Sequence, residues 1–239
     1  VFKPVELERE SYWQPTIEDF AAQITSRTKA IVINSPHNPT GMLLDQDFID
    51  SLIALCEQHD LYLVSDDVFA FSDFSEIGSQ LNVLKYKKAI LANVLSKTFG
   101  LPGVRIGWVM TRDEKLSTSI RDLKTYNSIC QSQLDEKVAF FVMQKAKALI
   151  KSNNTIVREN VELFDEFVAN NDSLSWHKPK AGMLGLVHAN EPLKPLLDSW
   201  FEKDVLVLPG NLFGIEGDYF RVGFGKKEFP QALACIVES

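Results

Sequence analysis

The sequence predicts an α/β protein with a mostly parallel sheet and flanking helices, followed by a smaller α+β domain. Two observations support this prediction. Short apolar runs alternate with amphipathic stretches in the first half of the 239-residue chain, and short strand-like segments return after a long helical region. Hydrophobic residues make up 45% of the chain and charged residues 24%, so we expect a soluble globular protein with a sizeable core.

The first half of the chain begins with the pattern strand, helix, strand. The apolar runs predicted as strands are residues 30–34, 61–65, 89–94 and 104–110. Residues 45–59 are predicted as a helix, because apolar side chains from Phe48 to Cys56 recur on one face and Asp45 can cap its start. A strand–helix–strand order implies a parallel sheet with right-handed crossovers.

The second half is predicted to be mostly helical from residue 113 to about residue 170, with a weak break at Lys151–Asn154. Short strands follow at residues 184–188, 205–208 and 219–224. We therefore expect a large domain over residues 1–150 and a small domain over residues 151–239.

Charge and cysteine content exclude several classes of protein. The net charge is -7 without a basic run, which argues against nucleic acid or a membrane surface as a partner. Cys56, Cys130 and Cys235 are far apart, so we expect buried free thiols in a reducing compartment, as in the cytoplasm. The four histidines lack the spacing of a metal site.

Lys97 is the first candidate for chemistry. It directly follows the third predicted strand, and side chains at the carboxyl end of a parallel strand face the crevice where such sheets bind ligands. Apolar neighbours on both sides favour a lysine partly shielded from water, which is a competent amine for Schiff-base formation. The alternative is an ordinary solvated surface lysine.

Two charged residues are expected near Lys97 in the predicted sheet. Arg105 follows it by eight residues, on the next predicted strand, and arginine suits a two-point grip on phosphate; a structural ion pair is the alternative. Asp66 ends the second strand and can face the same crevice, where a carboxylate could hold a proton on a cofactor's ring nitrogen. Neighbouring Asp67 could do the same, so the motif alone leaves both open.

Asn38 and Arg221 complete the candidate set. Asn38 opens a Pro-Gly turn after the first strand, where its amide could bind a ring substituent or simply form part of a turn. Arg221 has largely apolar neighbours in its strand, so it needs either a structural carboxylate or the α-carboxylate of a substrate as a partner.

In combination and order these motifs resemble those of the fold-type I, pyridoxal-phosphate-dependent aminotransferases of class I/II, the aspartate aminotransferase superfamily. The resemblance covers essentially the whole chain, and its most specific part surrounds Lys97. The resembling stretches are residues 35–41, 65–69, 95–107, 180–183, 208–214 and 220–222.

The resemblance implies a fold, a cofactor and a role for each candidate residue. Lys97 would bind pyridoxal 5'-phosphate as a Schiff base and then shuttle protons, and Asp66 would pair with the pyridine nitrogen. Asn38 would bind the 3-oxygen of the ring. Arg105 would bind the phosphate with the help of Ser96, and Arg221 would hold the substrate carboxylate. The reaction implied is ping-pong transfer of an amino group between an α-amino acid and a 2-oxo acid, in a homodimer.

The sequence also departs from the family pattern. Phe69 stands where the family usually has a tyrosine that donates to the ring 3-oxygen, and Val94 replaces a serine or threonine near the phosphate. The usual phosphate-cradling turn and ring-stacking aromatic residue are not found in residues 1–30, so we expect a chain that lacks its N-terminal portion. Alternatives are another fold-type I reaction, such as decarboxylation, elimination or cyclisation, or an inactive or ligand-sensing domain.

Overall fold

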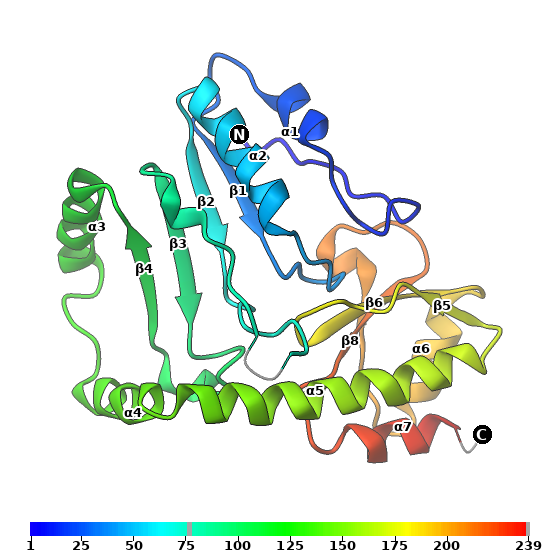
Figure 1. Cartoon of the computed structure of the whole chain (residues 1–239). Helices are drawn as coiled ribbons and strands as arrows, with labels where there is room; N and C mark the ends of the chain where they lie inside the picture. Colours follow the sequence, from blue (N-terminus) through cyan, green and yellow to red (C-terminus); the bar gives the residue numbers. More distant parts are fainter. Residues whose placement is uncertain (76–77, 238–239) are drawn as a thin grey trace.

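A computed structural model describes residues 1–75 and 78–237, which form two four-stranded sheets (Figure 1). Sheet A contains β1 (Ala30–Asn34), β2 (Tyr62–Asp66), β3 (Ala89–Val94) and β4 (Gly107–Thr111), in that order. The first three strands are parallel and β4 is antiparallel to β3, so the predicted mostly parallel sheet is confirmed. β4 begins three residues later than predicted, at Gly107, and Arg105 therefore precedes the strand.

Helix α2 (Gln46–Gln58) covers one face of sheet A, and α1 (Ile17–Gln23) packs beside it. The Asp45 carboxylate accepts a hydrogen bond from the Phe48 N–H at 2.8 Å, so the predicted cap and the predicted helix are both confirmed. Alternate strand residues point to this face, among them Ile31 and Leu63, and they join the buried side of α2 in one hydrophobic core.

The opposite face of sheet A is open in the described part of the chain. Val32 on β1 is 55% exposed and Val109 on β4 is 51% exposed, although both are apolar strand residues. The side chains of Asn34 and Asp66 belong to this same face, because they alternate with the buried residues of β1 and β2. The last polar residues of two adjacent strands therefore lie on an accessible surface.

Three helices follow sheet A: α3 (Glu114–Asn127), α4 (Gln133–Met143) and the long α5 (Ala146–Ala169), which runs beneath both sheets in Figure 1. The predicted break at Lys151–Asn154 is wrong, since α5 continues through it. Asn153 donates to the Thr98 carbonyl at 2.9 Å, and Asn154 donates to the Phe71 carbonyl at 2.8 Å. These amides bind neighbouring loops instead of interrupting the helix. The domain boundary at residue 150 stays a prediction.

Sheet B is antiparallel, with the order β5-β6-β8-β7. Its core contains Phe164 of α5 together with Phe220 and Val222 of β8, and the α+β character of this part is confirmed. The predicted strand at 205–208 is largely wrong, because β7 begins only at Leu208 and residues 205–207 are not in a strand. The remaining elements are β5 (Leu174–Trp176), β6 (Leu184–Ala189), α6 (Leu193–Phe201), β7 (Leu208–Pro209), β8 (Tyr219–Gly223), α7 (Phe229–Val237) and the 3-10 turns η1 (Val83–Lys85), η2 (Pro102–Val104) and η3 (Gly210–Phe213).

The three cysteines are free, but the expectation that all are buried is wrong. Cys56 is buried on α2, whereas Cys130 and Cys235 are exposed. Within the described residues, no helix combines the length and apolar character that crossing a membrane requires.

Candidate active site

The candidate site lies where β1, β2 and β3 end on the open face of sheet A. Asn34 and Asp66 are opposite each other in the parallel register, and the Asn34 amide donates to the Asp66 carbonyl at 2.9 Å. The Asn34 side-chain oxygen accepts a hydrogen bond from the backbone N–H of Asn38, also at 2.9 Å. Asn34 therefore ties the turn that carries Asn38 to the strand that carries Asp66. Sequence reasoning missed this function, although a polar amide at the end of an apolar strand could have indicated it.

The two adjacent acids, Asp66 and Asp67, have different environments. Asp67 is 1% exposed, and its carboxylate accepts hydrogen bonds from the Ser65 hydroxyl and, at 3.0 Å, from the Gln80 amide. Burial raises the pKa of Asp67, and the nearby charge of Asp66 raises it further. Asp66 is only partly buried and uses one carboxylate oxygen to accept from the Val68 N–H at 3.2 Å. Asp66 is thus the acid available to a ligand.

Lys97 lies three residues beyond the end of β3, on a well-anchored segment. The next residue, Thr98, donates its hydroxyl to the Ala70 carbonyl at 2.8 Å, and Asn153 donates to the Thr98 carbonyl. The Lys97 amine lies 5.7 Å from the centroid of the buried Phe69 ring. Lys97 itself is exposed, so its predicted shielding is wrong for the described part of the chain.

Arg105 reaches back to the residue before Lys97. Its guanidinium Nη1 lies 3.5 Å from the Ser96 hydroxyl oxygen and donates to the Pro102 carbonyl at 3.0 Å. Arg105 follows the turn η2 and has a φ of 55°, in the left-handed region. The predicted position on a strand is therefore wrong, because the Gly-Leu-Pro-Gly sequence at residues 100–103 leads into η2 before β4 begins. The predicted proximity to Ser96 is nevertheless present.

Arg221 connects sheet B to this site. Its Nη1 donates to the side-chain oxygen of Asn38 at 3.0 Å, across 183 positions of sequence, and its guanidinium carbon lies 4.4 Å from the centroid of the Phe213 ring. Burial lowers the pKa of Arg221 below its ordinary value. No ion pair between described residues involves Arg221, so the structural carboxylate considered from the sequence is not found among them.

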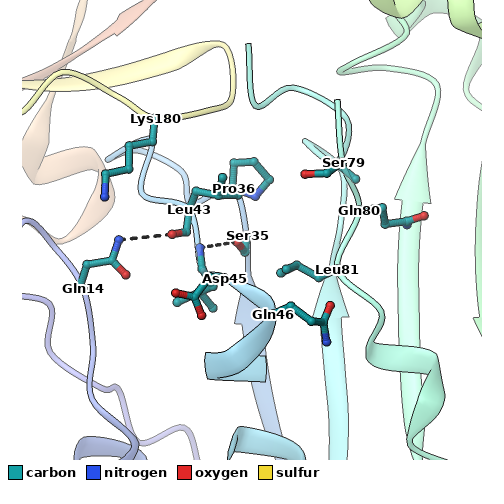
Figure 2. A pocket seen from close by; sticks show the side chains of 12 residues that line it. Gln14, Ser35, Pro36, Leu43, Asp45, Gln46, Ser79, Gln80, Leu81 and Lys180 are labelled. Atoms are coloured by element: carbon teal, nitrogen blue, oxygen red, sulfur yellow. Dashed lines mark hydrogen bonds between the residues drawn. The ribbon is translucent and has the colours of Figure 1, made fainter. Parts of the chain in front are cut away.

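A separate cavity of about 700 Å³ lies near the start of α2 and contains none of these candidate residues (Figure 2). Its polar lining is largely occupied by internal contacts. Gln14 donates to the Leu43 carbonyl at 3.3 Å, and the Ser35 hydroxyl accepts from the Leu44 N–H at 3.1 Å. We therefore place the active site at the strand ends and not in this cavity.

A lysine and an acid at the ends of parallel strands, a paired arginine and serine, and a second arginine on a smaller sheet are the groups expected for a pyridoxal-phosphate transferase of fold type I. The model of the family "Aminotransferase class I and II" matches residues 1–234, and the chain belongs to this family. The resemblance inferred from the motifs is thus confirmed.

Several known proteins are similar to this chain. Capreomycidine synthase of Streptomyces vinaceus is 29% identical over 99% of the chain and 62% of its own length. Arginine–pyruvate transaminase of Pseudomonas aeruginosa is 27% identical over 97% of the chain and 61% of its own length. The crystal structure of a PLP-dependent aminotransferase from Streptococcus suis has a TM-score of 0.88 at 29% identity, covering 98% of this chain and 62% of that one. The chain spans about three fifths of the length of these relatives.

Pyridoxal 5'-phosphate is the cofactor of this family, and the donor set of the site fits it. Among the described residues, the exposed Lys97 amine has neither a hydrogen bond nor an ion pair, and the paired Arg105 and Ser96 offer an N–H and hydroxyl donor set for a phosphate. Asp66 has one carboxylate oxygen that accepts no hydrogen bond from the described part of the chain. Phe69 and Val94 carry no side-chain donor, so these two positions contribute only apolar contact.

Proposed function

We propose that the protein is a pyridoxal-phosphate-dependent aminotransferase that moves an amino group from an α-amino acid to a 2-oxo acid. The observation that carries the proposal is the contact between Arg221 and Asn38, because this guanidinium makes no ion pair with a described residue and meets the turn that Asn34 ties to the end of β2. A planar carboxylate is the natural partner of such a guanidinium. A substrate held there would present its amino group toward the strand ends.

Different residues of the chain would bind different parts of the cofactor. Lys97 would carry it covalently, and Arg105 with Ser96 would hold its phosphate. The Asp66 carboxylate would keep a proton on the ring nitrogen, so that the bound ring can accept electrons from the substrate. Asn38 would donate its amide to the ring oxygen while its side-chain oxygen holds Arg221.

Proton movement would belong to Lys97. Its amine would act first as the base that takes a proton from the substrate Cα and then as the acid that returns one, while bound pyridoxal phosphate would supply the electron sink. Arg221 would fix the carboxylate during both half-reactions, because the amino acid and the 2-oxo acid share that group. One site would thus serve both substrates in turn, as a ping-pong mechanism requires.

A half-reaction tests this proposal directly. The purified chain is loaded with pyridoxal phosphate and mixed with single amino acids, and mass spectrometry then measures pyridoxamine phosphate and the matching 2-oxo acid. We expect equal amounts of the two products with at least one amino acid, and neither product with Lys97→Ala. Loaded protein that forms neither product with any common amino acid would contradict transamination by this chain.

A second candidate is a different reaction on the same cofactor. The similarity to capreomycidine synthase, a relative named as a synthase and not as a transaminase, favours this alternative. It predicts an altered amino acid product without the equimolar 2-oxo acid of the first proposal. The same mass-spectrometric experiment separates the two candidates.

Assembly and location are further parts of the proposal. We propose a cytoplasmic homodimer. The support for a dimer is the exposed apolar side chains of α3, α4 and the turn between them, including Tyr126 at 88% and Ile129 at 77% exposure. Sedimentation equilibrium should give twice the 27.0 kDa mass of the chain, and a monomer at micromolar concentration would contradict the dimer.

A further inference from the structure

We propose that Phe213 is a positioning residue that holds the Arg221 guanidinium in the orientation required for a planar carboxylate. The inference rests on the proposed role of Arg221 and adds a specificity determinant, since the sequence motifs contain Phe213 without giving it a role. The inference predicts that the Arg221 guanidinium binds a planar carboxylate in preference to a tetrahedral anion of similar size.

The contact between Phe213 and Arg221 is close and direct. The guanidinium carbon lies over the ring, 4.4 Å from its centroid, well within the roughly 6 Å range of cation–π attraction. Both side chains are only partly exposed, which strengthens the attraction compared with a fully hydrated pair.

The turn that carries Phe213 is built to lie against the strand that carries Arg221. A Cβ on Gly210 would come within 2.9 Å of the Tyr219 Cβ, so only glycine permits this approach of η3 to β8. The Ile215 N–H donates to the Gly210 carbonyl at 3.1 Å and closes the turn. Phe213 is therefore placed by backbone geometry and does not depend on a flexible loop.

Two contacts together restrict Arg221. A guanidinium has five N–H donors in one plane, and Asn38 engages one of them through Nη1 at 3.0 Å. The Phe213 ring holds the guanidinium carbon at a second point. In the sheet, the residues opposite Arg221 are Leu186 and Leu208, which cannot accept hydrogen bonds through their side chains. The remaining in-plane donors are thereby kept for a ligand that matches a planar, two-point geometry.

The test uses side-chain NMR of the full chain labelled with ¹⁵N-arginine. The Arg221 Nε–Hε signal is assigned by its disappearance in Arg221→Lys. Pyruvate and acetylphosphonate, which differ in having a planar or a tetrahedral anion, are titrated separately. Phe213→Leu removes the ring, Phe213→Tyr restores it, and Leu212→Ala is a matched control in the same turn at an exposed position.

We expect Phe213→Leu to shift the Arg221 signal, to weaken pyruvate binding about fivefold, and to reduce the preference for pyruvate over acetylphosphonate. Phe213→Tyr and Leu212→Ala should behave as the unchanged protein does. Circular dichroism of each variant checks its folding. If Phe213→Leu unfolds, Phe213→Tyr still tests the inference, because a folded Phe213→Tyr protein that loses the preference for pyruvate would count against the ring contact.

The outcomes distinguish this inference from the proposed function. Arg221-dependent pyruvate binding that is unchanged in Phe213→Leu would overturn the role of Phe213 and leave that of Arg221 intact. Pyruvate binding that is absent, or unaffected by Arg221→Lys, would overturn the carboxylate role of Arg221 and the inference with it.

Discussion

His37 is expected to make the folding of this chain sensitive to acid in a defined range. Its ring Nδ1 lies 2.9 Å from the Thr40 hydroxyl oxygen, which also accepts the Met42 N–H at 3.2 Å. Burial lowers the pKa of His37 from 6.5 to about 4, so the folded chain keeps the imidazole neutral. The turn that His37 begins also carries Asn38, and its protonation would therefore disturb both the fold and the site.

The magnitude follows from the pKa difference between the unfolded and folded chains. The unfolded chain binds the proton first, so the contribution of His37 is complete above pH 6.5 and is lost as the pH falls from 6.5 to about 4. The whole difference corresponds to about 3 kcal/mol of unfolding free energy, of which about 2 kcal/mol is lost by pH 5.

Urea unfolding followed by circular dichroism at pH 7.5 and pH 5 measures this loss, with His37→Gln as the comparison. We expect the unfolding free energy of the unchanged protein to fall by about 2 kcal/mol more than that of His37→Gln. Equal losses in the two proteins would refute the reasoning. So would an NMR titration in which the folded protein protonates His37 near its ordinary pKa of 6.5.

Two other predictions concern stability. Asp67→Asn should become more stable relative to the unchanged protein as the pH rises from about 3.5 to 7. Burial raises the pKa of Asp67, so its ionisation above the ordinary value of 3.8 disfavours the folded state. A constant difference in unfolding free energy between the two proteins across this pH range would contradict the burial argument. Asp45→Ala should lower the unfolding free energy by about 1 kcal/mol through loss of the α2 cap, whereas Asp45→Asn should retain most of the stability that the cap provides. Urea unfolding at pH 7 tests both variants. An unfolding free energy of Asp45→Ala equal to that of the unchanged protein would show that the cap contributes nothing.

Local sequence patterns predicted the parts of the fold that depend on local chemistry. The helix after Asp45 follows from its cap and its apolar period, and the parallel pairing of the first strands follows from the strand–helix–strand start. Asp66 and Lys97 lie at or just beyond the carboxyl ends of β2 and β3, as expected because parallel strands end at the same edge of a sheet. The motifs around these residues then indicated the family, which the family model confirms.

Other features depend on tertiary contacts that no local pattern contains. The amides of Asn153 and Asn154 indicated a helix break, but they bind loops distant in sequence. The contacts of Asn34 with the Asn38 turn and of Phe213 with Arg221 arise only when strands or turns meet. For the same reason, the motif alone did not decide whether Asp66 or Asp67 is accessible to a ligand. In the structure Asp67 is buried and Asp66 is only partly buried, which distinguishes the two.

The central claim is that Lys97 is the residue that carries the cofactor. The most direct measurement adds pyridoxal phosphate to the purified chain, reduces the mixture with borohydride and locates the added mass by peptide mass spectrometry, with Lys97→Ala as the control. The account predicts one phosphopyridoxyl group on Lys97, a shifted absorbance band before reduction, and neither in the control. A modification spread over surface lysines to the same extent in both proteins would contradict the account.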